Sequence, residues 1–521
     1  MSVYSGQIEA ALPRLLARFD TDPISPTRGQ GDRSYWAWKC VDFGNGTYQG
    51  AANGMARLLV SDMLPDWIAP ETVPARILDM FHGARTLRRP DGSMEEAFPW
   101  EGSFCVTALV AHDLLTAIEL LGERLDKTRR AWCLDVVRPM IGFLLKADET
   151  HGFISNHLAT ASAALYAWLE ITGEPVSDRA KFFLDRVLDA QSVEGWYPEY
   201  QGADPGYMTL TLTYLADILR RREDAALADS LHRAVRFLIY WVHPDGSFGG
   251  HYGSRETRLY HPAGVEFLAD RFPEAGALAR FMRRSVAEDR CVTLRAVDAP
   301  NLVPVFNGYA WASVLAARQG ELPSPEDHLP CLERGTWRRK FSKAGLLAAG
   351  GPSFYAVVSL HKGGVCYAFF KDGRTLVDTG AVYRHRSGRF YGTQALEENN
   401  LVREEGEDIV VESRLTAVRH MLPTPARFLL LRLLNLTVMR IRPVREGVKK
   451  LLVRLLITGG KRLPVVNVRR ITLGPEPRIE DRLEGPSRIV ADLERLEVDT
   501  PWRSLHMASS GYWQRGDGDI P

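Results

Sequence analysis

The stretch PDGSFGGHYGSR, residues 244–255, joins a glycine-rich turn to a histidine, a tyrosine and an arginine. Comparable turns occur earlier in the chain, at Asp91-Gly92, His151-Gly152 and Glu194-Gly195, and aromatic and polar residues follow each of them. Neighbouring turns are roughly 40 to 60 residues apart, which is the length of a helical hairpin with its loops. Repetition at this period is typical of stacked supersecondary units.

The region from about residue 50 to residue 320 has a helical pattern, because apolar residues recur at every third and fourth position between Gly, Pro and Asp turns. Several segments carry apolar or small residues on more than one side, which predicts an inner and an outer layer of helices. The expected helical segments are 51–64, 104–125, 129–147, 157–173, 178–191, 206–224, 226–242, 262–272, 273–288 and 308–320.

The recurring turns predict how these helices are arranged. If each glycine turn follows one helix and leads to the next helix in the same direction, all the turns lie at one end of the array. About six hairpins can then close into a ring, an (α/α) toroid, whose mouth carries the aromatic and polar residues. The alternative is that the glycines only terminate helices.

The character of the sequence changes near residue 320. A Pro-rich polar stretch, QGELPSPEDHLPCLERG (319–335), precedes short alternating or β-branched runs, which predict strands. The expected strands lie within 353–363, 364–378, 407–415, 426–443, 449–460 and 465–473. We therefore expect a multidomain α+β chain: an (α/α) toroid over 1–320, a linker over 321–333 and an antiparallel β-sandwich over 334–521.

Composition limits the classes of function. The net charge is +1, so no overall field favours nucleic acid or a membrane surface. Arg and Lys are dense between Arg427 and Arg470, either as solvent-facing strand positions or as a face for an anionic chain. No uninterrupted run reaches the ~18 apolar residues of a spanning helix, and the N-terminal residues lack the apolar segment of a secretory signal. Six scattered cysteines without a CxxC pair predict reduced thiols, no zinc site and a cytoplasmic location.

Two groups of candidate residues follow the turns. Asn156 and His157 come after Gly152 and open a helix, where unpaired backbone N–H groups favour an anion, or where Asn156 is only an N-cap. Tyr207 opens a later helix, downstream of Tyr197, Glu199 and Tyr200 in EGWYPEYQGADPGYMT (194–209). A tyrosine acts as an acid or base only where nearby positive charge lowers its pKa from about 10, so a structural role is the alternative.

The stretch 244–255 supplies further candidates. Arg255 is suited to bind a carboxylate through two donors, and His251 is suited to proton transfer. Tyr252 lies between them in the sequence as a possible sugar-contacting ring, and the alternative for Arg255 is a structural ion pair.

Two other patterns are compatible with a sugar substrate. Trp36 and Trp38 have period-two spacing, which fits a flat sugar-binding surface or a lid packed on the ring. The acids Glu95, Glu101 and Glu199 offer the carboxylate pair that glycoside hydrolysis requires. The chain has no P-loop, no GxGxxG after a strand, no GxSxG and no HExxH, so we expect no cofactor and no catalytic metal.

The motifs ISNH (154–157), EGWYPEYQGADPGY (194–207) and FGGHYGSR (248–255), in this order, resemble the heparinase II/III-like family of polysaccharide lyases. The resemblance implies an N-terminal (α/α) toroid and a C-terminal β-sandwich. It also implies that Asn156 and His157 neutralise a substrate carboxylate and that Tyr207 moves the proton; Tyr214 is a second candidate, well inside its helix. The family's β-domain often adds a histidine, for which His385 is the nearest match.

The sequence therefore predicts a uronate-directed lyase that cleaves an acidic oligo- or polysaccharide by β-elimination. The predicted catalytic residues are Asn156, His157, Tyr207 and His251, and the predicted substrate-binding residues are Arg255, Tyr252, Tyr197, Glu199, Trp36 and Trp38. The alternatives are a uronate C5-epimerase, a toroidal glycoside hydrolase, and a non-catalytic glycan-binding protein of a polysaccharide biosynthesis pathway.

Overall fold

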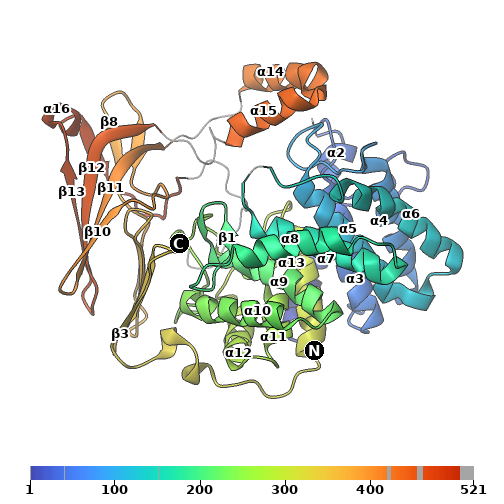
Figure 1. Ribbon diagram of the computed structural model, residues 1–521, viewed down its shortest axis with the longest axis horizontal. Helices are drawn as coiled ribbons and strands as arrows, with labels where there is room; N and C mark the ends of the chain where they lie inside the picture. Colours follow the sequence, from blue (N-terminus) through green and yellow to red (C-terminus); the bar gives the residue numbers. More distant parts are fainter. Residues whose placement is uncertain (1, 40, 151, 419–423, 454–460, 505–521) are drawn as a thin grey trace.

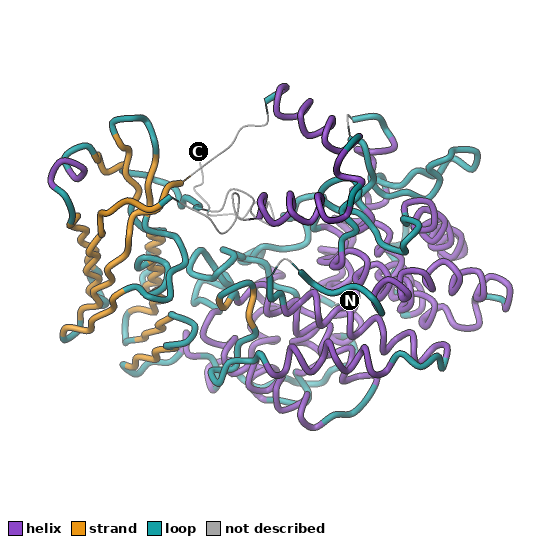
Figure 2. Tube along the Cα trace, turned by 45° about the horizontal axis from the view of Figure 1, so that its top comes forward, coloured by secondary structure: helices purple, strands orange, loops and turns teal. Residues whose placement is uncertain are grey.

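The computed structural model describes residues 2–39, 41–150, 152–418, 424–453 and 461–504. Helices make up one part of the molecule and strands the other, and Figures 1 and 2 show the two parts side by side. The chain passes from the toroid to the strands between Ala316 and Trp337, through two short 3-10 turns, and a pair of helices, Pro425–Val453, later interrupts the strands.

Six helices form a closed inner ring. They are α3 (Ala51–Val60), α5 (Phe104–Leu121), α7 (Ser155–Thr172), α9 (Pro205–Arg221), α11 (Pro262–Leu268) and α13 (Leu302–Ala316). Each packs against the next, and α13 packs back against α3. This closure confirms the predicted toroid.

A second layer of helices surrounds the ring. Its members, in the order of the inner helices that they cover, are α4 (Val73–Leu87), α6 (Lys127–Leu144), α8 (Ser177–Asp189), α10 (Ala225–Leu238), α12 (Pro273–Ala287) and α1 (Val3–Leu16). The sequence pattern did not predict α1 or α4. Helix α1 covers α13, and the Tyr4 hydroxyl donates to Glu266 over 2.6 Å, so the N-terminal segment completes the outer layer.

The glycine turns lie at one end of the ring, because each connects an outer helix to the N-terminus of the following inner helix. Gly92 and Gly195 have φ angles of +91° and +101°. A Cβ atom would lie 1.9 Å from the Pro139 carbonyl oxygen at the first position and 2.3 Å from the Arg233 carbonyl oxygen at the second, so both positions require glycine. We call this end, where the inner helices begin, the N-terminal end of the ring.

The longest apolar helix of the chain belongs to the inner ring. By length and hydropathy Phe104–Arg124 passes for a membrane span, although 83% of its apolar window is buried inside the protein. Both faces of α5 are covered, by neighbouring inner helices and by α6, which explains a composition this apolar in a core helix.

The strands form two antiparallel sheets. The first has the order β3 (Trp337–Phe341), β4 (Leu346–Gly350), β5 (Phe354–Ser359), β6 (Val365–Phe370) and β7 (Thr375–Asp378). The second has the order β13 (Arg478–Glu484), β12 (Arg462–Thr472), β11 (Asp408–Val418), β9 (Phe390–Gly392), β8 (Val382–His385) and β14 (Leu493–Leu496), with β10 (Leu401–Glu405) paired to β11.

The middle strands of the first sheet, β4, β5 and β6, are buried on both faces. On one face Ala356 and Val358 pack with Ile409 and Ile471 of the second sheet, which confirms the predicted β-sandwich. On the other face the first sheet, including Tyr367, joins the core of the toroid. Because successive side chains of a strand point to opposite faces, one sheet can serve both cores.

Two predicted strands, 426–443 and 449–460, are wrong. The chain forms two helices there, α14 (Pro425–Leu436) and α15 (Arg442–Val453), and residues 454–460 lie outside the described part. The Thr424 hydroxyl caps α14 by accepting from the Arg427 N–H, and Pro425 occupies its first turn. Most apolar residues of α14 are leucines, which favour a helix more than the β-branched residues of true strands do.

Candidate active site

The candidate site lies at the N-terminal end of the ring, where α7, α9 and the loop 248–257 meet. Asp204 connects two of these elements. Its carboxylate accepts from the Tyr207 N–H over 3.0 Å, which caps α9, and from the Arg255 N–H over 2.9 Å. Asp204 is 1% exposed, so this buried carboxylate fixes the loop against the start of the helix.

Arg255 carries a buried positive charge in this cluster. Its guanidinium lies 4.6 Å from the centroid of the Tyr200 ring, and its Nε and Nη1 atoms donate to no acceptor. Burial opposes the charge of Arg255, but Tyr207, Tyr200 and the carboxylate of Glu199 raise the pKa of the guanidinium above its usual value. A buried cation with two unused donors is suited to bind a carboxylate.

Glu199 lies beside Asn156. The Asn156 Nδ2 donates to the two Glu199 carboxylate oxygens over 3.1 and 2.9 Å. Burial raises the pKa of Glu199 to about 7, against the opposing effects of His157, Arg255 and the Asn156 hydrogen bond. A carboxyl with this pKa exchanges protons near neutral pH, as a general acid or base must.

His157 is paired with Glu149. The Nδ1 atom of His157 lies 2.6 Å from Glu149 Oε2, and the histidine side chain is 20% exposed. Burial opposes protonation of His157, but its contacts with Cys105 and Glu149 raise the pKa of the imidazole well above its usual value. The pair therefore places an imidazolium at the solvent-accessible edge of the cluster.

His251 faces the β-sandwich. Its Nδ1 lies 2.5 Å from the Tyr367 hydroxyl, and its backbone N–H donates to the same hydroxyl over 3.2 Å. Burial, together with the positive charges of Arg503 and Arg258, lowers the pKa of His251 well below its usual value. His251 is therefore a neutral imidazole held by the β-domain, whereas Asn156 and Arg255 surround Glu199.

Lys362 of the β-domain also holds the loop. Its Nζ donates to the carbonyl oxygens of His251 and Gly253 over 2.8 and 3.1 Å and pairs with Glu256 over 3.0 Å. Both charged side chains are almost completely buried. The expected β-domain histidine, His385, lies instead on β8 and hydrogen-bonds Ser387.

Two predicted substrate-binding tyrosines lie in the core. The Tyr197 hydroxyl is hydrogen-bonded to Ser230 over 2.7 Å, and the Tyr252 hydroxyl to His243 over 2.9 Å. The two tyrosines are 2% and 1% exposed. A sugar-contacting role does not fit this placement, because neither ring has a free face.

Trp36 and Trp38 do not form the expected flat pair. Trp36 ends the short helix α2 (Arg33–Trp36) and donates its Nε1–H to the Arg18 carbonyl, whereas Trp38 is 94% exposed. A helical turn, rather than the extended segment that period-two spacing implied, places the two rings in different surroundings.

Two of the candidate acids stabilise the loop before α5. Glu95 pairs with Arg89 over 2.5 Å and also accepts from the Trp100 N–H, and Glu101 accepts from the Ala97 N–H over 2.8 Å. Of the three candidate acids, Glu199 is the one that the Asn156 amide contacts.

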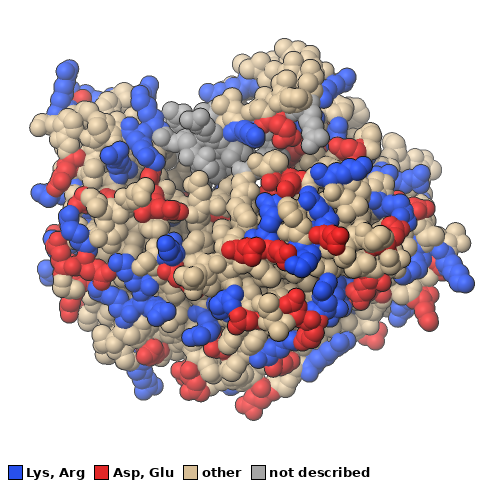
Figure 3. Space-filling view, viewed as in Figure 1, with Lys and Arg blue, Asp and Glu red and all other residues tan. Residues whose placement is uncertain are grey.

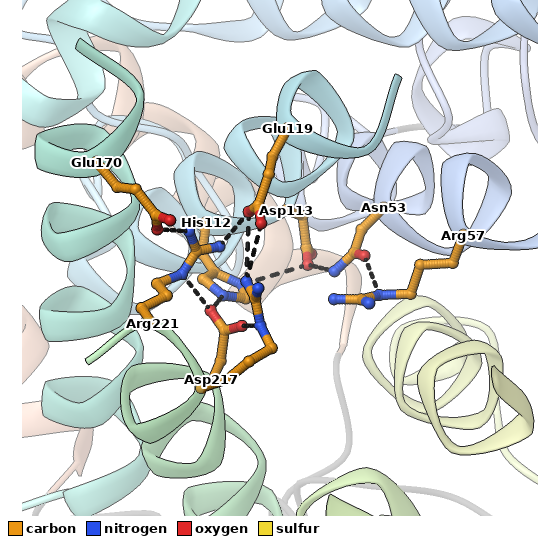
Figure 4. A network of polar contacts seen from close by, with 9 residues as sticks. Asn53, Arg57, His112, Asp113, Glu119, Glu170, Asp217 and Arg221 are labelled. Carbon is orange, nitrogen blue, oxygen red and sulfur yellow. Dashed lines mark hydrogen bonds and ion pairs between the residues drawn. The ribbon is translucent and has the colours of Figure 1, made fainter. Parts of the chain in front are cut away.

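A second polar cluster lies toward the other end of the ring (Figure 4). Asp217 contacts His112 and Arg221, each over 2.9 Å, and Arg221 also reaches Glu119 and Glu170, each over 2.6 Å. These residues come from α5, α7 and α9, so the network ties three inner helices together. Burial favours the neutral acid, but Arg221 and His112 hold the pKa of Asp217 well below its usual range.

A cavity on the ring axis adjoins this network. Its lining comes from four of the six inner helices (α3, α5, α9 and α13) and the residue before α11, and includes Asn53, Arg57, His112, Asp113, Tyr214 and His261. Burial raises the pKa of Tyr214 well above its usual value. Tyr214 is therefore the deeper of the two tyrosine candidates, whereas the charge of Tyr207 acts on Arg255.

Sequence reasoning missed several residues of the site. Asp204 precedes Pro205 at the start of a helix, and this Asp-Pro signal for an N-cap would have found it. Glu149, Lys362 and Tyr367 carry no such local signal, since they reach the site from an earlier loop and from the other domain.

The part of the chain that the structure describes contains neither a cluster of metal ligands nor a disulfide. No group of three or more His, Cys, Asp or Glu side chains there has the geometry to hold a metal ion. The five cysteines in this part are free, and Cys40 lies outside it.

Comparisons with known proteins return similar structures but no related sequence. No family model and no curated protein matches the chain. A chondroitin AC lyase from Streptomyces coelicolor A3 is similar at 12% identity and a TM-score of 0.48, over 80% of this chain and 67% of that one. Heparinase III is similar at 9% identity and a TM-score of 0.44, over 88% of this chain and 77% of that one. A family 76 glycoside hydrolase from Bacteroides thetaiotaomicron is similar at 11% identity and a TM-score of 0.43, over 61% of this chain and 78% of that one.

Proposed function

We propose that the protein is a lyase that cleaves acidic oligo- or polysaccharides next to a uronate residue, by β-elimination. One observation carries the proposal: the buried Arg255 guanidinium has unused donors and interacts electrostatically with Tyr207, at the start of α9, and with Glu199. The absence of a CxxC pair among six scattered cysteines supports a cytoplasmic site of action.

The first step of the proposed reaction is neutralisation of the substrate. The uronate carboxylate accepts a charge-assisted hydrogen bond from a free donor of the Arg255 guanidinium, Nε or Nη1. The imidazolium of His157 adds positive charge at the edge of the same cluster. With its carboxylate neutralised, the sugar loses its C5 proton more easily, because the enolate-like intermediate is stabilised by the same charges.

Tyr207 is the proposed base. The charge of Arg255 is stabilised by Tyr207, and the attraction between the two is strongest when the phenol is ionised. The phenolate takes the C5 proton, the C–H electron pair forms the C4–C5 double bond, and the C4–O bond breaks. The departing oxygen takes a proton back from the Tyr207 hydroxyl, so the step leaves no net change in protonation.

The site also supports two other outcomes of the chemistry. Return of the proton to the opposite face of C5 would make the enzyme a C5-epimerase through the same intermediate. The pKa of Glu199, raised by burial to about 7, favours a glycoside hydrolase in which this carboxyl is the general acid.

The test is incubation of the full chain with a panel of uronate-containing glycans. A lyase gives an ultraviolet-absorbing unsaturated product, an epimerase gives deuterium at C5 without cleavage, and a hydrolase gives new reducing ends without unsaturation. Binding of a uronate glycan with none of these products would overturn an enzymatic role and leave the glycan-binding alternative.

A further inference from the structure

The two-helix segment Pro425–Val453, which we call the hairpin, exposes an unusual amount of apolar surface. Among the described residues 21 large hydrophobic side chains are exposed, and 10 of them lie in this segment of 29 residues. The other exposed ones are scattered singly, which is normal for a soluble protein. A concentration of this kind marks an interaction surface.

The three most exposed leucines of α14 share one helical face. Leu429, Leu433 and Leu436 follow the spacing of four and three residues that aligns side chains on a helix, and they are 67%, 59% and 67% exposed. Asn435, on another face of the same helix, is 6% exposed. The apolar face of α14 is therefore turned to solvent, and a polar residue is turned inward.

The same segment is strongly basic. Residues 425–453 contain seven Arg and Lys residues and one acidic residue, Glu446, although the whole chain has a net charge of only +1. Figure 3 shows the hairpin, at the top of the molecule, as a mostly uncharged projection with Lys and Arg around it. Of these basic residues, Arg427, Arg440 and Lys450 are exposed.

Arg432 and Arg440 of the hairpin contact the toroid. The Arg432 guanidinium pairs with Asp42 over 2.7 Å, and the Arg440 guanidinium lies 5.2 Å from the centroid of the Trp100 ring. Asp42 and Trp100 belong to the segments that precede α3 and α5. The hairpin therefore projects beyond the N-terminal end of the ring, as Figure 1 shows.

We propose that this hairpin docks the protein on the surface of an anionic phospholipid bilayer, with the leucine face of α14 inserted at the headgroup boundary. An interfacial helix combines apolar side chains that enter the acyl region with Arg and Lys that attract anionic headgroups, and the hairpin has both. A soluble polyanion would use the basic residues but gain nothing from exposed leucines. The proposal does not depend on the proposed lyase activity.

The experiment is flotation of the full chain with vesicles of phosphatidylcholine alone and of phosphatidylcholine mixed with phosphatidylglycerol. We expect binding to the mixed vesicles, weakened by salt, and little binding to the neutral ones. The triple variant Leu429→Ser, Leu433→Ser and Leu436→Ser should lower binding about tenfold or more, because the leucine face is lost. The change Lys450→Gln should lower binding about fivefold.

Matched controls separate insertion from general hydrophobicity. The triple variant Ile24→Ser, Val193→Ser and Leu401→Ser removes equally exposed apolar residues elsewhere, at 90%, 90% and 63% exposure, and should bind vesicles like the unaltered chain. All altered leucines are exposed, so the variants should keep the circular dichroism spectrum and melting temperature of the parent.

Three outcomes would overturn the proposal. In the first, the parent binds neutral and anionic vesicles equally well, and the leucine variant binds both as well as the parent does. Another is a change of molar mass in light scattering, from dimer to monomer, caused by the leucine variant without any vesicle binding by the parent, which would assign the face to a second copy. The third is binding of polyuronate through the hairpin in the absence of vesicle binding, which would assign it to an anionic glycan.

Discussion

The carboxylate of Asp204 accepts a hydrogen bond of 2.9 Å from the backbone N–H of Arg255, a residue 51 positions later in the chain. The same carboxylate caps α9. One buried acid thus sets the start of the helix that carries Tyr207 and the position of the arginine beside it.

Replacing this acid should affect both stability and activity. The change Asp204→Ala removes a helix cap and leaves the backbone N–H of Arg255 without its acceptor, so we expect a loss of about 2 to 4 kcal/mol in the free energy of unfolding. Denaturant titration measures it. The control Asp224→Ala removes the cap of α10, an outer helix, and should cost only about 1 kcal/mol with activity unchanged. Equal effects of the two changes would contradict a special role for Asp204.

Tyr207 should be essential for turnover but not for folding. The change Tyr207→Phe removes the proposed base and should lower kcat about 10²- to 10⁴-fold on a uronate substrate, with little change in melting temperature. Tyr166→Phe, on α7, is the control, since Tyr166 lies beside Arg222 rather than Arg255. Full activity of the Tyr207 variant would transfer the base role to another residue, for which Glu199 is the first candidate.

Glu199 should make stability depend on pH. Its folded pKa, raised by burial to about 7, lies above its unfolded value near 4.3. The folded state therefore binds the proton more tightly, and stability falls as pH rises from about 4 to about 7, by up to about 3 kcal/mol. Glu199→Gln should remove this part of the decline. Parallel curves of melting temperature against pH for the parent and the variant would show that Glu199 has an ordinary pKa.

The ion pair between Lys362 and Glu256 should couple the two domains. Removing one partner leaves a buried charge, so Lys362→Met should cost about 3 to 5 kcal/mol in the free energy of unfolding. The double variant Lys362→Met with Glu256→Gln should recover part of this loss, because the remaining charge is also removed. Additive losses in the double-mutant cycle would contradict a direct interaction.

Breaking the network in Figure 4 should destabilise the ring without affecting the site. His112→Gln leaves the buried Asp217 without one of its partners, and we expect a loss of about 3 kcal/mol. His232→Gln is the control, because the His232–Glu274 pair is partly exposed and should contribute less than about 1 kcal/mol. A selective loss of turnover by the His112 variant would instead indicate that the axial cavity takes part in function.

Local patterns in the sequence were sufficient for most helices of the toroid and for strands β5, β6, β7, β11 and β12, but not for the other strands of the β-domain. Periodicity placed α5, α7 and α9 correctly, because an inner helix that is buried on several sides has a long apolar pattern. The same reasoning failed at α14, where a run of exposed leucines was taken for a buried strand. Hydropathy shows that a residue is apolar but does not show whether the residue is buried or exposed. Helix α1 was missed because its partner, α13, is almost 300 residues away.

The sequence by itself determined that glycine turns recur at hairpin spacing and that Asn156, Tyr207 and Arg255 follow three of them. Only the tertiary structure decided which of these side chains meet, because closure of the ring, through contact of α13 with α3, brings distant turns to one end. The tertiary structure also decided the protonation and the hydrogen bonding of the side chains in the site. The near-neutral pKa of Glu199 and the unused donors of Arg255 arise from burial among residues remote in sequence, which no local pattern encodes.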